Sequence, residues 1–82
     1  MSIQAAKPDH VVVNIHINDV HFKLDRQEFT GAELAALASI PAGNQMFLDV
    51  PGNGDDTPIG AEEQVTVRSG MKFYDVPVGN LG

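Results

Sequence analysis

The sequence has no cysteine, few basic residues and no long apolar run, and each absence excludes a class of protein. Without cysteine there is no disulfide and no thiolate nucleophile, so the fold must be held together by packing alone. Five Lys and Arg residues against eleven acids give a net charge of −6, which argues against nucleic-acid binding because phosphate contacts need cations. No segment approaches the ~20 apolar residues of a membrane span. The 82 residues therefore indicate one small acidic domain, expected in the cytoplasm and away from membranes.

The composition along the chain predicts three parts. Residues 1–10 show no hydrophobic periodicity and are expected to form a flexible leader. Residues 11–77 carry the alternating and helical patterns of a folded domain. Residues 78–82 contain two glycines and one asparagine and are expected to form a flexible C-terminal tail.

A β-hairpin is the clearest local prediction. Residues 13–17 and 20–25 both alternate apolar with polar side chains, and only Asn18 and Asp19 lie between them. Both of these residues tolerate positive φ, as a two-residue hairpin turn requires. This turn places His16 opposite His21 on one face. It places all the apolar partners on the other face, in the pairs Ile17–Val20, Ile15–Phe22 and Val13–Leu24.

One short helix is expected after the hairpin. Thr30 and Glu33 have the spacing of a capping box, in which the side chain of each residue accepts a hydrogen bond from the backbone of the other. Phe29 precedes the cap and Leu34 stands at the fourth helical position, which is the spacing of a hydrophobic staple. Pro41 disfavours helical geometry in the residue before it, so the helix should end near Ser39.

The remaining segments predict short strands and one long loop. The apolar run 45–50 indicates a third strand, and the Pro- and Gly-rich segment 51–58 indicates a loop. Residues 65–67 favour a short strand, and residues 71–76 favour a final one. Two apolar residues of that last segment, Phe73 and Val76, can both point inward only if the strand contains a bulge.

This order of elements predicts an α+β fold in which a mixed sheet packs on a single helix. If the final strand pairs in parallel with the first, the chain between them provides the long crossover that parallel pairing requires. The result is the β-grasp arrangement, with an expected core of Leu34, Leu37, Ile15, Ile17, Phe22 and Leu48.

Four segments of the sequence resemble the ubiquitin-like superfamily and, more narrowly, the bacterial multiubiquitin family. They are Ile15-His16-Ile17-Asn18-Asp19-Val20, the helix start Phe29-Thr30-Gly31-Ala32-Glu33-Leu34-Ala35-Ala36-Leu37-Ala38, Ile40-Pro41, and the ending Lys72-Phe73-Tyr74-Asp75-Val76-Pro77. Many members of that family carry tandem copies of the domain, whereas this chain carries one.

The resemblance implies a protein modifier, which is a substrate of enzymes and not an enzyme. In such modifiers the C-terminal glycine carboxylate is adenylated, passed to an enzyme cysteine as a thioester and transferred to an amine. Here Gly82 occupies that position, and Leu81 stands where the usual ending has a second glycine. The tail that would thread the enzyme channel consists of Val78, Gly79, Asn80 and Leu81.

The implied partners are an activating enzyme, a conjugating enzyme, a metal-dependent JAB-type deconjugating protease and target proteins, with no cofactor of its own. Family context suggests defence against phage. Glycine suits the reacting position for a chemical reason as well, because it has no Cβ to obstruct a narrow channel. The five residues after Pro77 span at most ~17 Å when extended.

The paired histidines, His16 and His21, leave several interpretations open. They supply two of the four ligands of a structural zinc site without an evident third, so no metal site is expected. A solvated sheet face, a pH-sensitive pair and a partner-binding surface are the alternatives. No Ser stands in a motif with a base, so no catalytic residue is expected.

The competing function is a non-catalytic binding or self-assembly module. A β-grasp sheet has exposed edge strands, and these can pair with other chains. In this interpretation the protein forms a homo-oligomer or filament, and its tail is not conjugated. Whether modifier chains form through Lys7, Lys23 or Lys72 is left open by the sequence.

Overall fold

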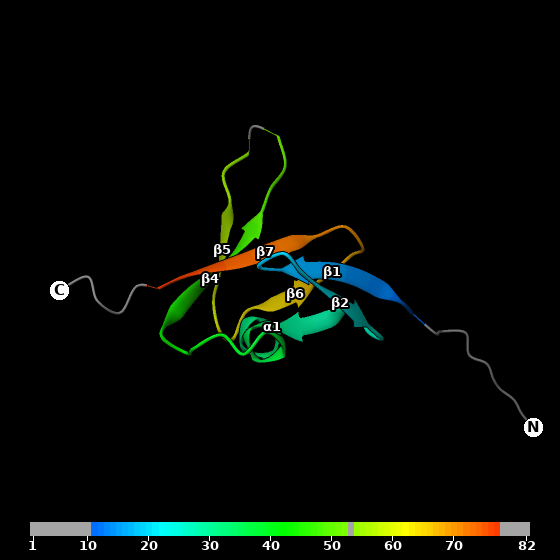
Figure 1. The fold of residues 1–82 in the computed structure, drawn as a ribbon, viewed down its shortest axis with the longest axis horizontal. Coiled ribbons are helices and arrows are strands. Elements are labelled where there is room, and N and C mark those ends of the chain that lie inside the picture. Colours follow the sequence, from blue (N-terminus) through cyan, green and yellow to red (C-terminus); the bar gives the residue numbers. More distant parts are fainter. Residues whose placement is uncertain (1–10, 53, 78–82) are drawn as a thin grey trace, which may run out of the picture.

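The computed structural model describes residues 11–52 and 54–77, which form seven strands and one helix (Figure 1). The predicted leader and tail lie outside these residues. The elements in chain order are β1 (Val13–Ile17), β2 (Val20–Leu24), β3 (Glu28–Thr30), α1 (Gly31–Leu37), β4 (Asn44–Asp49), β5 (Thr57–Ile59), β6 (Gln64–Thr66) and β7 (Lys72–Pro77).

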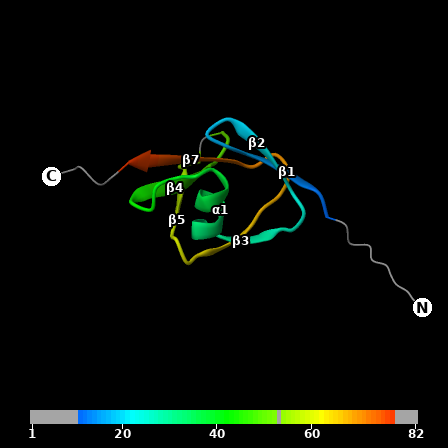
Figure 2. The same ribbon diagram turned by 60° about the horizontal axis from the view of Figure 1, so that its bottom comes forward.

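A five-stranded mixed sheet in the order β2-β1-β7-β4-β5 forms the main layer. β1 and β7 are parallel, and every other pair in the sheet is antiparallel. β3 and β6 form a separate two-stranded ribbon, and α1 packs beneath the main sheet (Figure 2). The final strand thus lies at the centre of the sheet beside the first. This confirms the predicted α+β class and its β-grasp arrangement.

The predicted hairpin is confirmed in both turn and register. Asn18 and Asp19 have φ of 52° and 68°, the positive values of a two-residue type I′ turn. His16 is paired with His21, and the three apolar pairs match the expected ones. Burial falls towards the sheet edge, however, and Val20 on the edge strand β2 is 56% exposed.

The helix begins as the sequence predicts. The Glu33 backbone N–H donates to Thr30 Oγ1 at 3.1 Å, and the Thr30 N–H donates to Glu33 Oε1 at 2.8 Å. The capping box therefore satisfies two backbone donors that have no partner within the helix. Phe29 and Leu34 are both buried in one core cluster, as the staple requires.

The helix ends two residues earlier than expected, because the chain reverses at Ser39. Ser39 has φ of 57°, which is the left-handed conformation that usually selects glycine at this position. Its N–H donates to the Ala36 carbonyl at 3.2 Å, and the Ile40 N–H donates to the Ala35 carbonyl at 2.9 Å. These two bonds form a Schellman motif. A serine thus occupies a glycine-type position.

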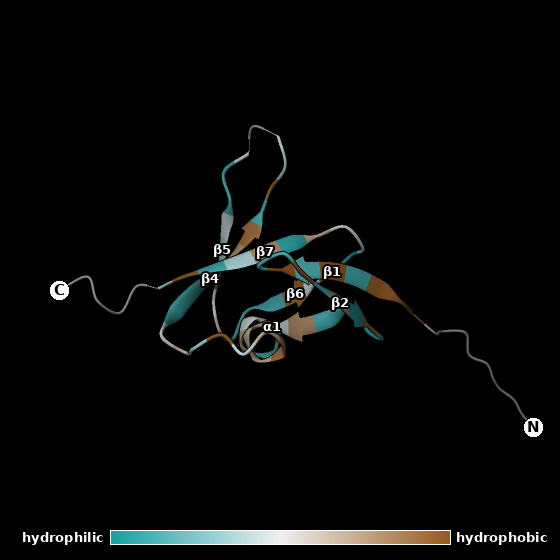
Figure 3. Cartoon of the chain, viewed as in Figure 1, coloured by the Kyte–Doolittle hydropathy of each residue, from teal (hydrophilic) through white to brown (hydrophobic). Residues whose placement is uncertain are grey.

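The core lies between α1 and the main sheet, and apolar residues of the strands contribute to it. Figure 3 shows the apolar part of β1 in brown. Leu34, Ile15 and Ile17 are fully buried, as predicted. The prediction for Leu37 is wrong, because the helix ends at this residue and leaves it 37% exposed. Phe22 and Leu48 are only half-buried at the edges of the cluster. The other buried residues include Met46, Ile59, Val67 and Phe73.

One prediction about the second half of the chain is corrected, and the open question about Phe73 and Val76 is answered. Thr57 and Pro58, expected in a loop, belong to β5, where Pro58 pairs with Phe47. An edge strand tolerates proline because one of its sides needs no backbone donor. The pairing of β4 with β7 is regular over six residues, so no bulge turns Val76 inward, and its side chain is 39% exposed.

Candidate functional site

The candidate site is the end of β7, where the chain leaves the folded domain. β7 is the central strand, and its last residue, Pro77, pairs with Asn44 at the start of β4. The residues predicted to react and to thread an enzyme channel lie outside the described part of the chain: Gly82, and Val78, Gly79, Asn80 and Leu81. The structure therefore defines the point from which this segment starts.

Three polar residues fasten this end of the sheet. Asp75 of β7 accepts hydrogen bonds from Asn18 Nδ2 and Asn44 Nδ2, each at 2.6 Å. Asn18 follows β1 and Asn44 opens β4, so one carboxylate connects the strand ends on both sides of β7. The hydrogen bonds from Asn44 and then Asn18 lower the pKa of Asp75. We call Asn18, Asn44 and Asp75 the exit cluster.

Sequence reasoning missed the exit cluster. Asp75 pairs with buried Met46, and the next pair on the same face is Leu48 with Phe73, so Asp75 occupies a core-facing register position at the rim. An acid at that position in an otherwise apolar alternation is the one signal that pointed to it. Its partners are 57 and 31 residues away in sequence, and neither spacing suggests contact.

The outer face of the sheet carries the predicted histidine pair. The rings of His16 and His21 lie with centroids 5.4 Å apart and planes tilted by 39°. His21 Nε2 forms a hydrogen bond with Asn14 Oδ1 at 2.8 Å. Among residues 11–52 and 54–77, no group of three or more His, Cys, Asp or Glu side chains is placed to hold a metal ion. The pair is thus a partly exposed polar surface on β1 and β2.

A second outer-face group joins β4 and β7 to the loop between β4 and β5. Phe47 stacks on Tyr74 with ring centroids 5.3 Å apart and an interplanar angle of 13°. The Tyr74 hydroxyl donates to Asp56, whose other carboxylate oxygen accepts from the Val50 N–H at 3.1 Å. The hydrogen bond to Asp56 raises the pKa of Tyr74 to about 12 and lowers the pKa of Asp56. Asp56 thereby ties this loop to the central strand.

The order of the strands, the parallel pairing of first with last, and the single helix define a ubiquitin-like domain. The multiubiquitin family model matches residues 13–75, which includes all but the last two residues of the described sheet. The chain belongs to the multiubiquitin family. Searches of curated proteins and of solved structures gave no match. Within the described residues, no helix is long and apolar enough to cross a membrane.

Proposed function

We propose that this protein is a bacterial ubiquitin-like modifier that is attached to amines of target proteins through the carboxylate of Gly82. An activating enzyme joins this carboxylate to AMP from ATP with release of pyrophosphate, and an enzyme cysteine then displaces AMP to form a thioester. A conjugating enzyme passes the acyl group to an amine, and a JAB-type protease removes it. In this role the chain is a substrate and supplies no catalytic residue.

The observation that carries the proposal is family membership over residues 13–75, combined with the position of β7. The central strand is held on both sides, and the exit cluster fixes its last residues at the rim of the sheet. The segment after Pro77 therefore starts from a fixed point on the domain, and an enzyme that grips the domain would find this starting point in one place.

The exposed surface offers contacts for the partner enzymes and for chain formation. Lys23 on β2 and Lys72 on β7 are both exposed and are candidate acceptors if one modifier is joined to another. Lys7 lies outside the described residues. His16 and His21 form a candidate partner surface beside Lys72, which is the parallel neighbour of His16. A cytoplasmic role in defence against phage belongs to this proposal.

The test is thioester formation with the matched activating enzyme and ATP. We expect a covalent adduct that survives denaturation and is removed by thiol reductant. Gly82→Val should abolish it, because a branched Cβ obstructs the approach to the acyl carbon. Asn80→Ala, a change in the same tail, is the matched control and should retain the adduct. If an enzyme shown to be active on another modifier forms no adduct with this protein, the proposal is wrong.

The second candidate function is self-assembly without conjugation, and one observation favours it. Among the described strands, β2 lies at the edge of the main sheet and pairs on one side with β1, and its Val20 is 56% exposed. Exposed edge strands can pair with the same strand of a second copy. Size-exclusion chromatography across a range of concentrations distinguishes the two functions. Assembly without any enzyme that is reduced by Val20→Lys favours this module, whereas a monomer at every concentration favours the modifier.

A further inference from the structure

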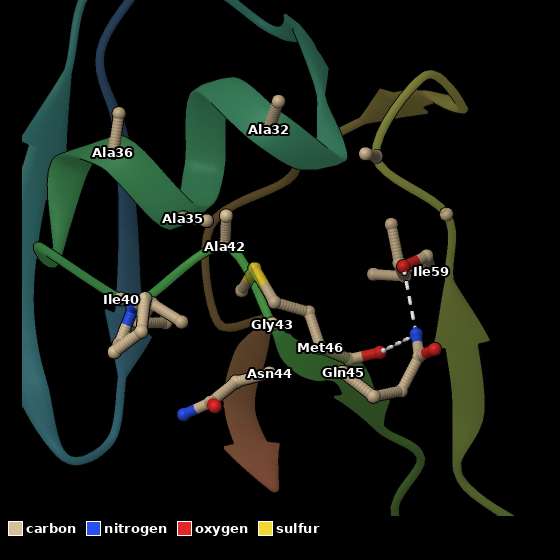
Figure 4. Close-up of a pocket in the computed structure, with 13 residues that line it drawn as sticks. Ala32, Ala35, Ala36, Ile40, Ala42, Gly43, Asn44, Gln45, Met46 and Ile59 are labelled. Atoms are coloured by element: carbon tan, nitrogen blue, oxygen red, sulfur yellow. Dashed lines mark hydrogen bonds between the residues drawn. The ribbon is translucent and has the colours of Figure 1, made fainter. Parts of the chain in front are cut away.

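An uncharged groove runs between α1 and the sheet. It has a volume of about 400 Å³, and its walls are α1, the loop after α1, the start of β4, and the segment from the end of β5 to Ala61. Figure 4 shows Ala35 directed towards the loop and strand residues on the other side of the groove, whereas Ala32 and Ala36 point away from them. Many of the lining side chains are small, as at Ala35 and Ala42, and Ile40 and Met46 add larger apolar surfaces.

Hydrogen bonds hold the walls of the groove together, and the lining carries no charged side chain. Gln45 Nε2 donates to the carbonyls of Met46 and Ile59, each at 2.9 Å, so this amide bridges β4 and β5 and satisfies their backbone acceptors. Gly60 and Ala61 bring the opposite wall close to the helix, where the Ala32 N–H donates to the Ala61 carbonyl at 2.9 Å. None of the lining residues is charged, although the chain carries sixteen charged side chains.

The groove opens next to the point where β7 ends. Asn44 lines the groove, pairs with Pro77 in the sheet and donates to Asp75. The Asn44–Pro77 pair belongs to the same face of the sheet as Met46, which is the face that α1 covers. The chain after Pro77 therefore starts at the mouth of the groove, on the side where the groove lies.

The segment after Pro77 matches the groove in chemistry and in reach. Its side chains are uncharged, and two of them, Val78 and Leu81, are apolar. Gly79 and Asn80 between these two favour a turn, because both accept positive φ. A turn at this point would carry Leu81 back towards Asn44, within the ~17 Å that five residues can span.

We propose that the groove is a docking site for residues 78–81 of the same chain, with Leu81 seated against Ala35 and Ala42. A tether this short gives the segment a high effective concentration at the groove, which favours the same chain over a second copy. Burial of two apolar side chains opposes the entropy lost by four ordered residues, and these effects are similar in size. The docked segment is therefore readily released. Taken with the proposed function, docking is a resting state from which the activating enzyme lifts the tail.

The test is methyl NOE spectroscopy on the full chain, which requires no enzyme and so can fail independently of the proposed function. We expect NOEs between the Leu81 methyls and the methyls of Ala35 and Ala42, unchanged on dilution. Ala42→Glu places a charge at the groove and should remove them. Val20→Glu makes a similar change at an exposed apolar residue elsewhere and should leave them intact.

Two further measurements make every outcome informative. In a sample that mixes isotope-labelled with unlabelled chains, an NOE between chains would show that a second copy occupies the groove and would overturn the proposal. Leu81→Ser in the full chain should shift the amide resonances of Ala35 and Ala36, whereas Asn80→Ser should shift them less. The comparison of Leu81→Ser with Asn80→Ser does not require the Ala42→Glu variant to fold. Absence of both the NOEs and these shifts would also overturn the proposal.

Discussion

The two halves of the domain are held together over very different distances along the chain. In the first half, the β1–β2 turn and the capping box connect residues that are three apart, namely Ile17 with Val20 and Thr30 with Glu33. In the second half, β7 depends on distant partners, and Asp75 bonds to residues 31 and 57 positions away. The difference indicates that the first half can form from local interactions, whereas the site in the second half requires the completed sheet.

The largest effect is expected where the two halves meet, at Gly31. A Cβ on this residue would overlap the Gly60 carbonyl oxygen and lie 3.0 Å from Ile59 Cγ2. Because the first of these atoms is backbone, Gly31→Ala must displace the β5–β6 connection, and we expect a loss of about 3 kcal/mol in the free energy of unfolding. Urea denaturation measures this loss.

Gly43→Ala is the matched control for that variant. A Cβ at Gly43 meets no other atom within 4 Å, so we expect a change of no more than about 0.5 kcal/mol. Equal effects of the two substitutions would contradict the close contact between the helix start and the β5–β6 connection.

The next effect belongs to the first half. Thr30→Ala removes the side-chain acceptor of the capping box and leaves the Glu33 N–H without its partner, which should cost about 1 kcal/mol. Thermal unfolding followed by circular dichroism measures the change. Thr57→Ala, on the exposed edge strand β5, should change stability by less than about 0.5 kcal/mol. If the two variants unfold alike, the cap does not stabilise the helix.

A smaller effect of opposite sign is expected at the end of the helix. Ser39→Gly should stabilise the protein by about 0.5–1 kcal/mol, because relief of the left-handed conformation exceeds the entropy that glycine adds to the unfolded chain. Ser69→Gly should instead destabilise it, since Ser69 Oγ accepts the Asn14 N–H at 3.0 Å. The same substitution thus has opposite signs at two sites, and a stabilised Ser69→Gly or a destabilised Ser39→Gly would refute this account.

The last prediction concerns the titration of Tyr74, the single tyrosine of the chain. This titration takes place far above neutral pH, so it has the smallest effect on stability under ordinary conditions. The Tyr74 pKa of about 12 lies above the ordinary value of 10, so the stabilising contribution is complete below pH ~10 and is lost as the pH rises through 12. An ultraviolet absorbance titration of the phenolate reports this pKa directly. Asp56→Asn should lower the pKa of Tyr74 towards 10, because it removes the carboxylate that accepts the hydrogen bond from the Tyr74 hydroxyl.

Asp55→Asn is the control for the titration. It removes a neighbouring exposed acid that makes no hydrogen bond to Tyr74, so the phenolate titration should stay near that of the unmodified chain. A titration of the unmodified protein near pH 10 would contradict the Asp56–Tyr74 hydrogen bond, and with it the attachment of the β4–β5 loop to β7.

The elements held by local contacts could be predicted from the sequence more fully than those held by long-range contacts. The hairpin register was predictable because Asn18-Asp19 fixes the turn, and alternation on both sides then leaves one register that buries the apolar set. The helix start was predictable because its capping residues are neighbours in sequence. Strand β5 was not, since Pro58 carries a loop signal, and only its pairing with Phe47 makes it a strand.

The candidate site divides in the same way. The contact between His16 and His21 follows from the turn and was predicted from the sequence. The exit cluster was not, because its three residues belong to three separate strand ends that only the completed sheet brings together. Leu37 was assigned to the core from helical periodicity alone, but the periodicity does not reveal that the helix ends at this residue and leaves its side chain 37% exposed.

The most direct test of the central claim, that this domain is a modifier joined through Gly82, is mass spectrometry of a reconstituted conjugation reaction. The protein is incubated with the matched activating and conjugating enzymes, ATP and an amine acceptor protein, and the products are digested. The account predicts a branched peptide in which the Gly82 carbonyl is bonded to a lysine Nε, present with Asn80→Ala and absent with Gly82→Val. Recovery of the protein unmodified, from enzymes that conjugate another modifier in the same reaction, would contradict it.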